Sequence, residues 1–236
     1  MKKNITLIVL LSIGLSSISF AQKNIVKFRP LPLAWGSIDF SYERVLSEQS
    51  SVAAKIGFMI PLDFTTPYNN YASQNSSSGN GSAYSGFTIT KVGIGGFSFL
   101  PEYRFYTEKQ APNGFYVAPY LKFWRAAVSL TGKNDTTSAT YGMVGSLNIY
   151  GAGVGIGYQW IISDIVSIDW NFLGLGVDAY VLGLNFTGAD ASGGADQIKQ
   201  KIPNSSLVIS ANSASLTLPP AVLPAFKCNF SIGVKF

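Results

Sequence analysis

The sequence predicts an all-β fold, a closed antiparallel up-and-down barrel that crosses a membrane, and three features indicate it. Apolar and polar residues alternate along eight segments, which is typical of strands with two unlike faces. Charged residues make up only 12% of the chain, against about 25% in ordinary soluble domains. After residue 21, no apolar run is long enough to span a bilayer as a helix. We expect eight strands, with ten as the alternative.

The eight segments are joined by two kinds of connection. Those at 47–50, 107–114 and 162–164 are short and polar, whereas 61–86, 131–145 and 187–221 are longer and rich in Ser, Asn, Gly and Thr. Short turns on one side and long loops on the other are typical of outer-membrane barrels, with the turns periplasmic. The expected strands lie near 24–30, 37–46, 51–60, 87–106, 115–130, 146–161, 165–186 and 222–236.

Two details of the pattern concern the longer segments. The stretch SLVISANSASLTL in the last loop is expected to extend the barrel as a hairpin above the membrane, or else to add two strands. The apolar residues change parity near Gly95 and Gly96 in the fourth segment and near Gly174 and Gly176 in the seventh, where glycine can supply a bend.

The N-terminus has the features of a secretory signal peptide. Lys2 and Lys3 precede the apolar run ITLIVLLSIGLSSISF, which ends at Ala21. We expect residues 1–21 to be the signal peptide and 22–236 the barrel domain. Removing the two lysines lowers the net charge from +5 to +3, which is too small to indicate a nucleic-acid partner.

Composition argues against catalysis. The chain contains no histidine and one cysteine, Cys228, so it lacks the commonest general base and cannot form an internal disulfide. The glycines of GAGVGIG alternate strictly and do not match a dinucleotide-binding loop. We therefore expect no enzyme activity, no catalytic residue, no cofactor and no metal.

The polarity of the two strand faces decides which side meets lipid. In YGAGVGIGYQW, residues 150–160, bulky side chains oppose four glycines and a glutamine. A soluble lipocalin-like barrel, which is the structural rival, needs many Lys and Glu on its polar face. Here that face holds Gly, Ser and scattered charges, so we expect it to line a narrow interior while the bulky face contacts lipid.

Several charged residues share the inward parity. The interior of an eight-stranded barrel is filled by side chains, and an unpaired buried charge is costly. We therefore expect a salt-bridged network that closes the lumen; a gated pore and paired carboxylates for acid/base chemistry are the alternatives. The predicted network comprises Lys27, Arg29, Asp39, Glu43, Lys55, Glu102, Arg104 and Asp169, with Lys122 as a further candidate.

The chain ends on KCNFSIGVKF, an alternating ladder that is expected to pair with the first strand and so remove a free sheet edge. Aromatic residues beside the short turns are expected to form a girdle at the membrane interface. They are Tyr103, Phe105, Tyr158, Trp160, Trp170 and Phe236.

Three stretches carry a family resemblance: NIVKFRPLPLAWGSIDFSYERVL, LPEYRFYTEKQAPNGFYVAPYLKF and GAGVGIGYQWIISDIVSIDWNFLGLGV. They resemble a family of small bacterial outer-membrane barrels of OmpX/OmpW-like architecture that is carried as a domain of unknown function. The resemblance implies the outer membrane of a Gram-negative bacterium. The last strand also resembles the sorting signal read by the outer-membrane assembly machinery, formed here by Phe230, Ile232, Val234 and Phe236, although Ser231 stands where glycine is common.

The expected function is therefore a structural or surface-interaction role, exerted through the loops 61–86 and 187–221, in a monomer whose lumen is plugged. Expected partners are outer-membrane lipid, the assembly machinery during biogenesis and a surface ligand of unknown kind. The alternatives are a narrow channel for small or apolar solutes, a lipid-modifying enzyme and a soluble lipocalin-like carrier.

Overall fold

The structure is a computed structural model that describes residues 23–63, 65–66, 87–108, 110–134, 138–188, 199–200, 204–210 and 212–236. The expected signal peptide, most of the expected loop 61–86 and parts of the expected loop 187–221 lie outside these residues. Among the described residues, no helix is both long and apolar enough to cross a membrane.

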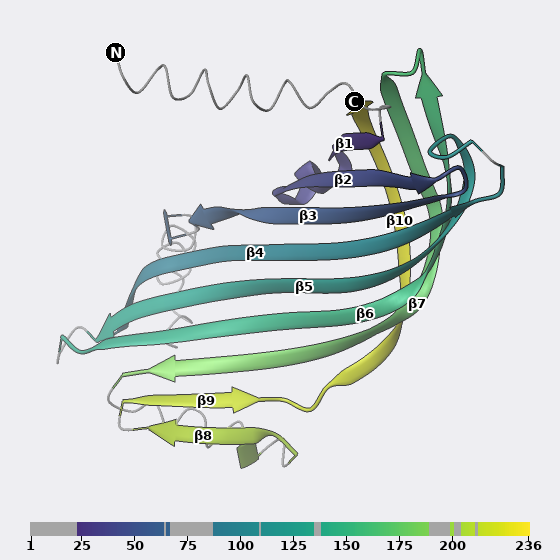
Figure 1. The fold of residues 1–236 in the computed structure, drawn as a ribbon. Helices are drawn as coiled ribbons and strands as arrows, with labels where there is room; N and C mark the ends of the chain where they lie inside the picture. The colour runs from purple at the N-terminus through teal and green to yellow at the C-terminus, as the bar shows by residue number, and fades with distance from the viewer. Residues whose placement is uncertain are drawn as a thin grey trace, which may run out of the picture.

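The described residues form one antiparallel sheet with ten strands and a short 3-10 helix, η2 (Figure 1). η2 ends at Gly36, whose φ of 74° is a left-handed conformation that glycine adopts without steric cost. The elements are β1 (Asn24–Arg29), η2 (Leu31–Trp35), β2 (Ser37–Ser47), β3 (Ser50–Asp63), β4 (Phe87–Tyr106), β5 (Gly114–Asn134), β6 (Thr140–Ile162), β7 (Val166–Thr187), β8 (Ser206–Ser210), β9 (Ser213–Thr217) and β10 (Ala221–Lys235).

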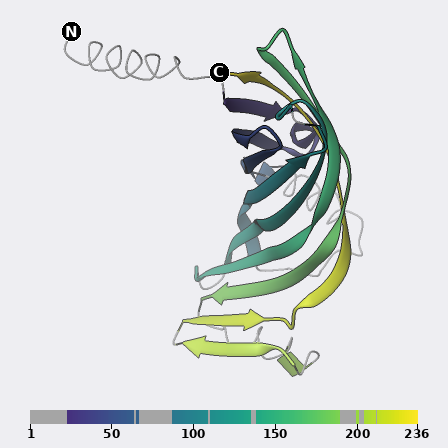
Figure 2. The same ribbon diagram turned by 45° about the vertical axis from the view of Figure 1, so that its right-hand side comes forward.

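Eight of the strands close into a ring, as the alternation predicts. β1 to β7 pair in sequence order, and β10 pairs with β7 on one side and with β1 on the other. The closing contact between β1 and β10 runs from Ile25↔Lys235 to Phe28↔Ile232. β8 and β9 form a hairpin attached to the end of β7, away from β1 and β2 (Figures 1 and 2). The two extra strands are thus an extension of one wall and not part of the ring.

The hairpin between β5 and β6 is longer than the sequence pattern suggests. The segment 131–145 was expected to be a loop, but the strands pair as far as Lys133↔Thr140. The pairing continues in the same register from Leu130↔Met143 to Lys133↔Thr140, with Tyr141 and Met143 on the inner face. The prediction of a loop at 131–145 is therefore wrong over most of that range.

A bulky apolar band covers the outer face of the long strands, beginning at the short turns. On β5 it runs from Phe115 to Phe123, and on β6 it covers 150–160. Its side chains are exposed, for example Leu121 at 62% and Phe58 at 55%. The same outward orientation holds for Phe40 on β2.

Beyond this band, the polarity of the two faces reverses. β5 and β6 pair without a register shift, so residues in step with the buried Tyr120 stay on the inner face. Outside, polar residues such as Arg125 and Asn148 replace the aromatic ones, while Val128 and Leu147 point inward. β4 shows the same reversal near Gly95 and Gly96, where its pairing with β5 stays regular.

The two parity changes seen in the sequence therefore have different causes. In β7, the pairing with β6 skips Phe172, which is the extra residue of a bulge. In β4, Gly95 and Gly96 pair in register with Ala127 and Ala126 of β5, so β4 has no extra residue there; the register shift opposite Gly95 lies in β3, between Met59 and Leu62. The polarity of the two faces of β4 therefore reverses without a shift of β4 against β5.

Glycines on the inner face of β6 leave room for aromatic side chains from β5. A Cβ atom on Gly153 would lie 2.6 Å from Oη of Tyr120, and one on Gly157 would lie 2.5 Å from Oη of Tyr116. Both distances are far inside van der Waals contact. The bare face of β6 therefore lets these rings lie across the interior.

We expect Gly153→Val to lower the free energy of unfolding by about 1–3 kcal/mol, because the new side chain overpacks the interior. Urea titration of the refolded protein measures the change. Gly95→Val is the matched control, since a Cβ there meets no atom within 4 Å. Equal effects of the two substitutions would contradict this account of the interior.

Candidate functional site

Polar and charged side chains fill the part of the interior nearest the short turns. Lys27 of β1, Glu43 of β2 and Arg104 of β4 are fully buried, and Asp169 of β7 is 1% exposed. Each lies on the inner face because its neighbours in sequence face outward. A network of charges is therefore enclosed by the ring of strands.

Lys27 is fully hydrogen bonded across the interior. Its Nζ donates to Oε2 of Glu43 at 2.5 Å, to Oδ2 of Asp169 at 2.8 Å and to Oε1 of Gln159 at 2.8 Å. A lysine ammonium has three donors, and all three are used. The partners come from β2, β6 and β7, so one side chain joins four strands.

Arg104 makes three salt bridges in the network, as many as Glu102. Its two terminal nitrogens donate to Glu43, Gln159, Glu102 and Asp169 at 2.8–3.2 Å. Its Nε lies 3.3 Å from Oε2 of Glu102. The planar guanidinium thus satisfies carboxylates on three strands at once.

Two tyrosines cover the network on the side of the turns. Oη of Tyr106 donates to Oε1 of Glu43 at 2.8 Å, and Oη of Tyr116 donates to Oδ1 of Asp169 at 2.7 Å. The Arg104 guanidinium lies 4.4 Å from the centroid of the Tyr116 ring, a cation–π contact. These two tyrosines cover the side of the network that faces the short turns.

A second group of charges lies farther from the turns. Oε1 of Glu102 accepts from Nζ of Lys55 at 2.7 Å and also from Nζ of Lys227. Arg29 and Asp39 form a pair at 2.9 Å. Glu102 joins Lys55 and Lys227 to Arg104 in one continuous network, whereas Arg29 bonds Asp39 and Asn229.

All eight residues of the predicted network lie in the interior, and each forms at least one salt bridge. The further candidate, Lys122, also points inward and pairs with Asp178 above the network. Pattern reading missed Gln159, Lys227 and Asp178. Lys227 has the same parity as the other polar residues of β10, so the sequence pattern could have identified it. Asp178 could not be found in this way, because the extra residue Phe172 changes the parity of the inward residues of β7 between Asp169 and Asp178.

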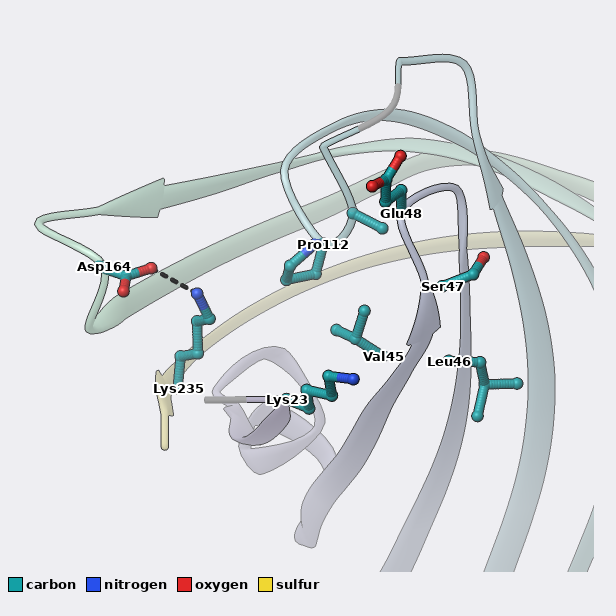
Figure 3. A pocket seen from close by; sticks show the side chains of 9 residues that line it. Lys23, Val45, Leu46, Ser47, Glu48, Pro112, Asp164 and Lys235 are labelled. Carbon is teal, nitrogen blue, oxygen red and sulfur yellow. Dashed lines mark hydrogen bonds and ion pairs between the residues drawn. The ribbon is translucent and has the colours of Figure 1, made fainter. Parts of the chain in front are cut away.

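A separate groove opens at the turn end of the barrel. Figure 3 shows Glu48 from the β2–β3 turn, Pro112 from the β4–β5 connection and Lys23 at the start of β1 around it. Asp164 and Lys235 form an ion pair at its edge. The groove lies outside the buried network. Within the described part of the chain, no group of three or more Cys, Asp or Glu side chains is arranged to hold a metal ion.

The fold and its interior define a small antiparallel β-barrel with a charge-filled lumen. The chain belongs to the family described as Protein of unknown function (DUF3575), which matches residues 5–185. No match was found among curated proteins.

A solved structure that resembles the chain is that of a major outer membrane protein from Thermus thermophilus. The two are 11% identical, the alignment covers 90% of this chain and 98% of that one, and the TM-score is 0.40. At that identity and score, the assignment of a barrel rests on this chain's own strand pairing.

We expect Glu102→Ala to destabilise the barrel by about 3–5 kcal/mol, because removing this carboxylate leaves buried cations without a partner. Lys55, Arg104 and Lys227 would all lose a salt bridge. Urea unfolding of the refolded protein provides the measurement. Asp164→Ala is the control, since Asp164 is 71% exposed in its pair and should contribute under about 1 kcal/mol. A loss from Glu102→Ala as small as the control's would show that the network does not stabilise the fold.

Proposed function

We propose that this protein is an integral outer-membrane β-barrel with a structural or surface-interaction role, whose lumen is closed by the charge network. One observation carries the proposal. Over the same lengths of strand, the outer face is apolar and exposed while the inner face is charged and buried. A soluble barrel of the lipocalin kind requires the reverse arrangement.

The height of the apolar band supports a membrane location. A transmembrane strand needs about 9–11 residues to cross the hydrocarbon layer. The band on β5, Phe115 to Phe123, and that on β6, 150–160, both match this length. At the turn end, Tyr103 packs on Phe105 and Tyr158 on Trp160, both with ring centroids 4.6 Å apart, as in an interfacial girdle.

In this proposal, the protein is exported with residues 1–21 as its signal peptide and resides in the outer membrane of a Gram-negative bacterium as a monomer. The filled interior and the eight-strand ring favour an OmpX/OmpW-like architecture over a porin. Outer-membrane lipid contacts the band, and the loops 61–86 and 187–221 offer the surface for a ligand.

The proposed role is not catalytic. In the network, each carboxylate is held by at least one cation, for example Glu43 by Lys27 and Arg104. A carboxylate held between two cations is a weak base, and the chain contains no histidine to act in its place. The network is better suited to stabilising and closing the barrel.

Planar-bilayer recording tests the closed lumen. We expect no steady conductance from the wild-type protein, because an ion would have to displace buried and paired side chains. The variant Lys55→Ala/Glu102→Ala/Arg104→Ala serves as a positive control that should conduct, with insertion of both proteins checked by their mobility on unboiled gels. Wild-type conductance equal to that of the triple variant would favour the channel alternative.

Single-cysteine labelling tests the membrane orientation. In a Cys228→Ser background, Asn148→Cys should react with a membrane-impermeant maleimide in intact cells. Val154→Cys lies in the apolar band and should be protected by lipid. Equal labelling at both positions, or release of the protein by alkaline washing, would count against a membrane-spanning barrel.

The assembly-signal hypothesis concerns Phe230, Ile232, Val234 and Phe236 on the outer face of β10. We expect Phe236→Ala to reduce the amount of protein in the outer membrane several-fold, since the assembly machinery would lose the terminal aromatic residue. The substitution keeps the backbone hydrogen bonds between residue 236 and Asn24, so ring closure is not the variable. Phe226→Ala, which removes a 78% exposed ring on the same strand, is the control. Equal amounts of the two variants in the outer membrane would contradict the hypothesis.

A further inference from the structure

The groove at the turn end of the barrel is a cavity that the buried charge network does not use. Its volume is about 640 Å³, within the range of small-molecule sites, which is about 300–1,000 Å³. It is lined by residues from the β2–β3, β4–β5 and β6–β7 connections and from the turn-side ends of β1 and β10. The groove therefore exists only once these segments have come together.

Backbone hydrogen bonds hold the walls of the groove in place. The N–H of Ala111 donates to the carbonyl oxygen of Glu48 at 2.8 Å, which fixes the β4–β5 connection against the β2–β3 turn. The N–H of Val45 donates to the carbonyl oxygen of Lys23 at 2.7 Å, which fixes the residue before β1 against β2. The side chains that line the groove are thus carried by a paired backbone, although several of them lie in connections.

Two charges of opposite sign lie on opposite sides of an apolar floor. Val45 is 8% exposed, and Pro112 is buried as well. Figure 3 shows these two residues between Lys23 and Glu48. Lys23 and Glu48 are exposed, and neither side chain has a hydrogen bond or an ion pair with another residue that the structure describes. Both charged groups are therefore available to a ligand that lies on the floor.

These charges select the class of ligand. A simple anion is attracted by Lys23 and repelled by Glu48, and the reverse holds for a simple cation. Lys235 adds no free cation, because it is paired with Asp164 at the edge of the groove. A molecule with a carboxylate at one end and an ammonium group at the other is attracted at both ends, and an apolar body between them covers the floor. A short peptide with free termini has this form, since both of its ends are charged near neutral pH.

We propose that the groove binds a short zwitterionic peptide, with its carboxylate beside Lys23, its ammonium group beside Glu48 and its side chains against Val45 and Pro112. Because exposed ion pairs are weak, the dissociation constant is on the order of a millimolar. This binding function goes beyond the closed barrel proposed above. Only the placement of the groove in the periplasm rests on that proposal.

Nuclear magnetic resonance titration of the full-length mature protein in non-ionic detergent micelles tests the proposal. The probes are trialanine, its N-acetyl form, its C-terminal amide and the form blocked at both ends, which share one body and differ in their end charges. We expect trialanine to shift the backbone amide signals of Glu48 and Ala111 saturably. Each single block should lower the affinity about two- to fivefold, the change for one exposed ion pair, and added salt should reduce this difference.

Two variants assign the ends of the bound peptide. Lys23→Gln should weaken trialanine binding about two- to fivefold and leave binding of the C-terminal amide unchanged. Glu48→Gln should weaken trialanine binding by a similar factor and leave binding of the N-acetyl form unchanged. Lys133→Gln and Glu108→Gln are the matched controls, since both residues are exposed and neither lines the groove. The controls should bind all four probes as the wild-type protein does.

Three results would overturn the proposal. They are no shift of the groove signals by any probe, equal affinity for trialanine and its doubly blocked form, and control variants that weaken trialanine binding as much as Lys23→Gln does. Peptide binding in micelles does not depend on membrane orientation, and conductance and labelling do not depend on the groove. Either proposal can therefore fail while the other stands.

Discussion

The pairing of charges inside a narrow ring of strands is the constraint on which the closed end of the barrel depends. Lys27 and Arg104 are fully buried, and each donates to carboxylates on several strands. Removing such groups from water is costly unless every donor and acceptor finds a partner. The partners come together only when β7, β10 and β1 have joined. Closure of the ring and completion of the network therefore require each other.

The glycines of β6 make this arrangement possible. The network needs width, because tyrosine, arginine and lysine side chains lie across the axis. Gly153 and Gly157 give the interior that width, since their bare faces meet the hydroxyl ends of Tyr120 and Tyr116. A strand with ordinary side chains on both faces would leave no room for the rings. The contrast between the bulky and bare faces of β6 is thus a packing requirement of the interior.

The barrel combines two opposite distributions of polarity along one set of strands. Near the turns, charges lie inside and aromatic residues outside. Beyond the row of Lys122 and Asp178, apolar residues lie inside and residues such as Arg125 and Asn148 outside. Backbone hydrogen bonding does not depend on which face is apolar, so β5 and β6 remain in register where the polarity of their faces reverses. In the proposed membrane location, hydrocarbon surrounds the outer face of the first zone and water that of the second.

The sequence by itself determined the all-β class, the eight strands of the ring and the inward parity of charges such as Glu43 and Glu102, because alternation is a local property of the chain. Only the tertiary structure decided which charges meet, since Lys27 and Asp169 are brought together by closure. It also decided where parity fails. The extra residue Phe172 turns Asp178 onto the same face as Asp169, whereas near Gly95 the polarity reverses along a strand that stays in register with β5. The periodicity of the sequence cannot separate the bulge in β7 from the polarity reversal in β4, because both exchange the apolar and polar positions of a strand. Only the pairing of the backbone distinguishes the two.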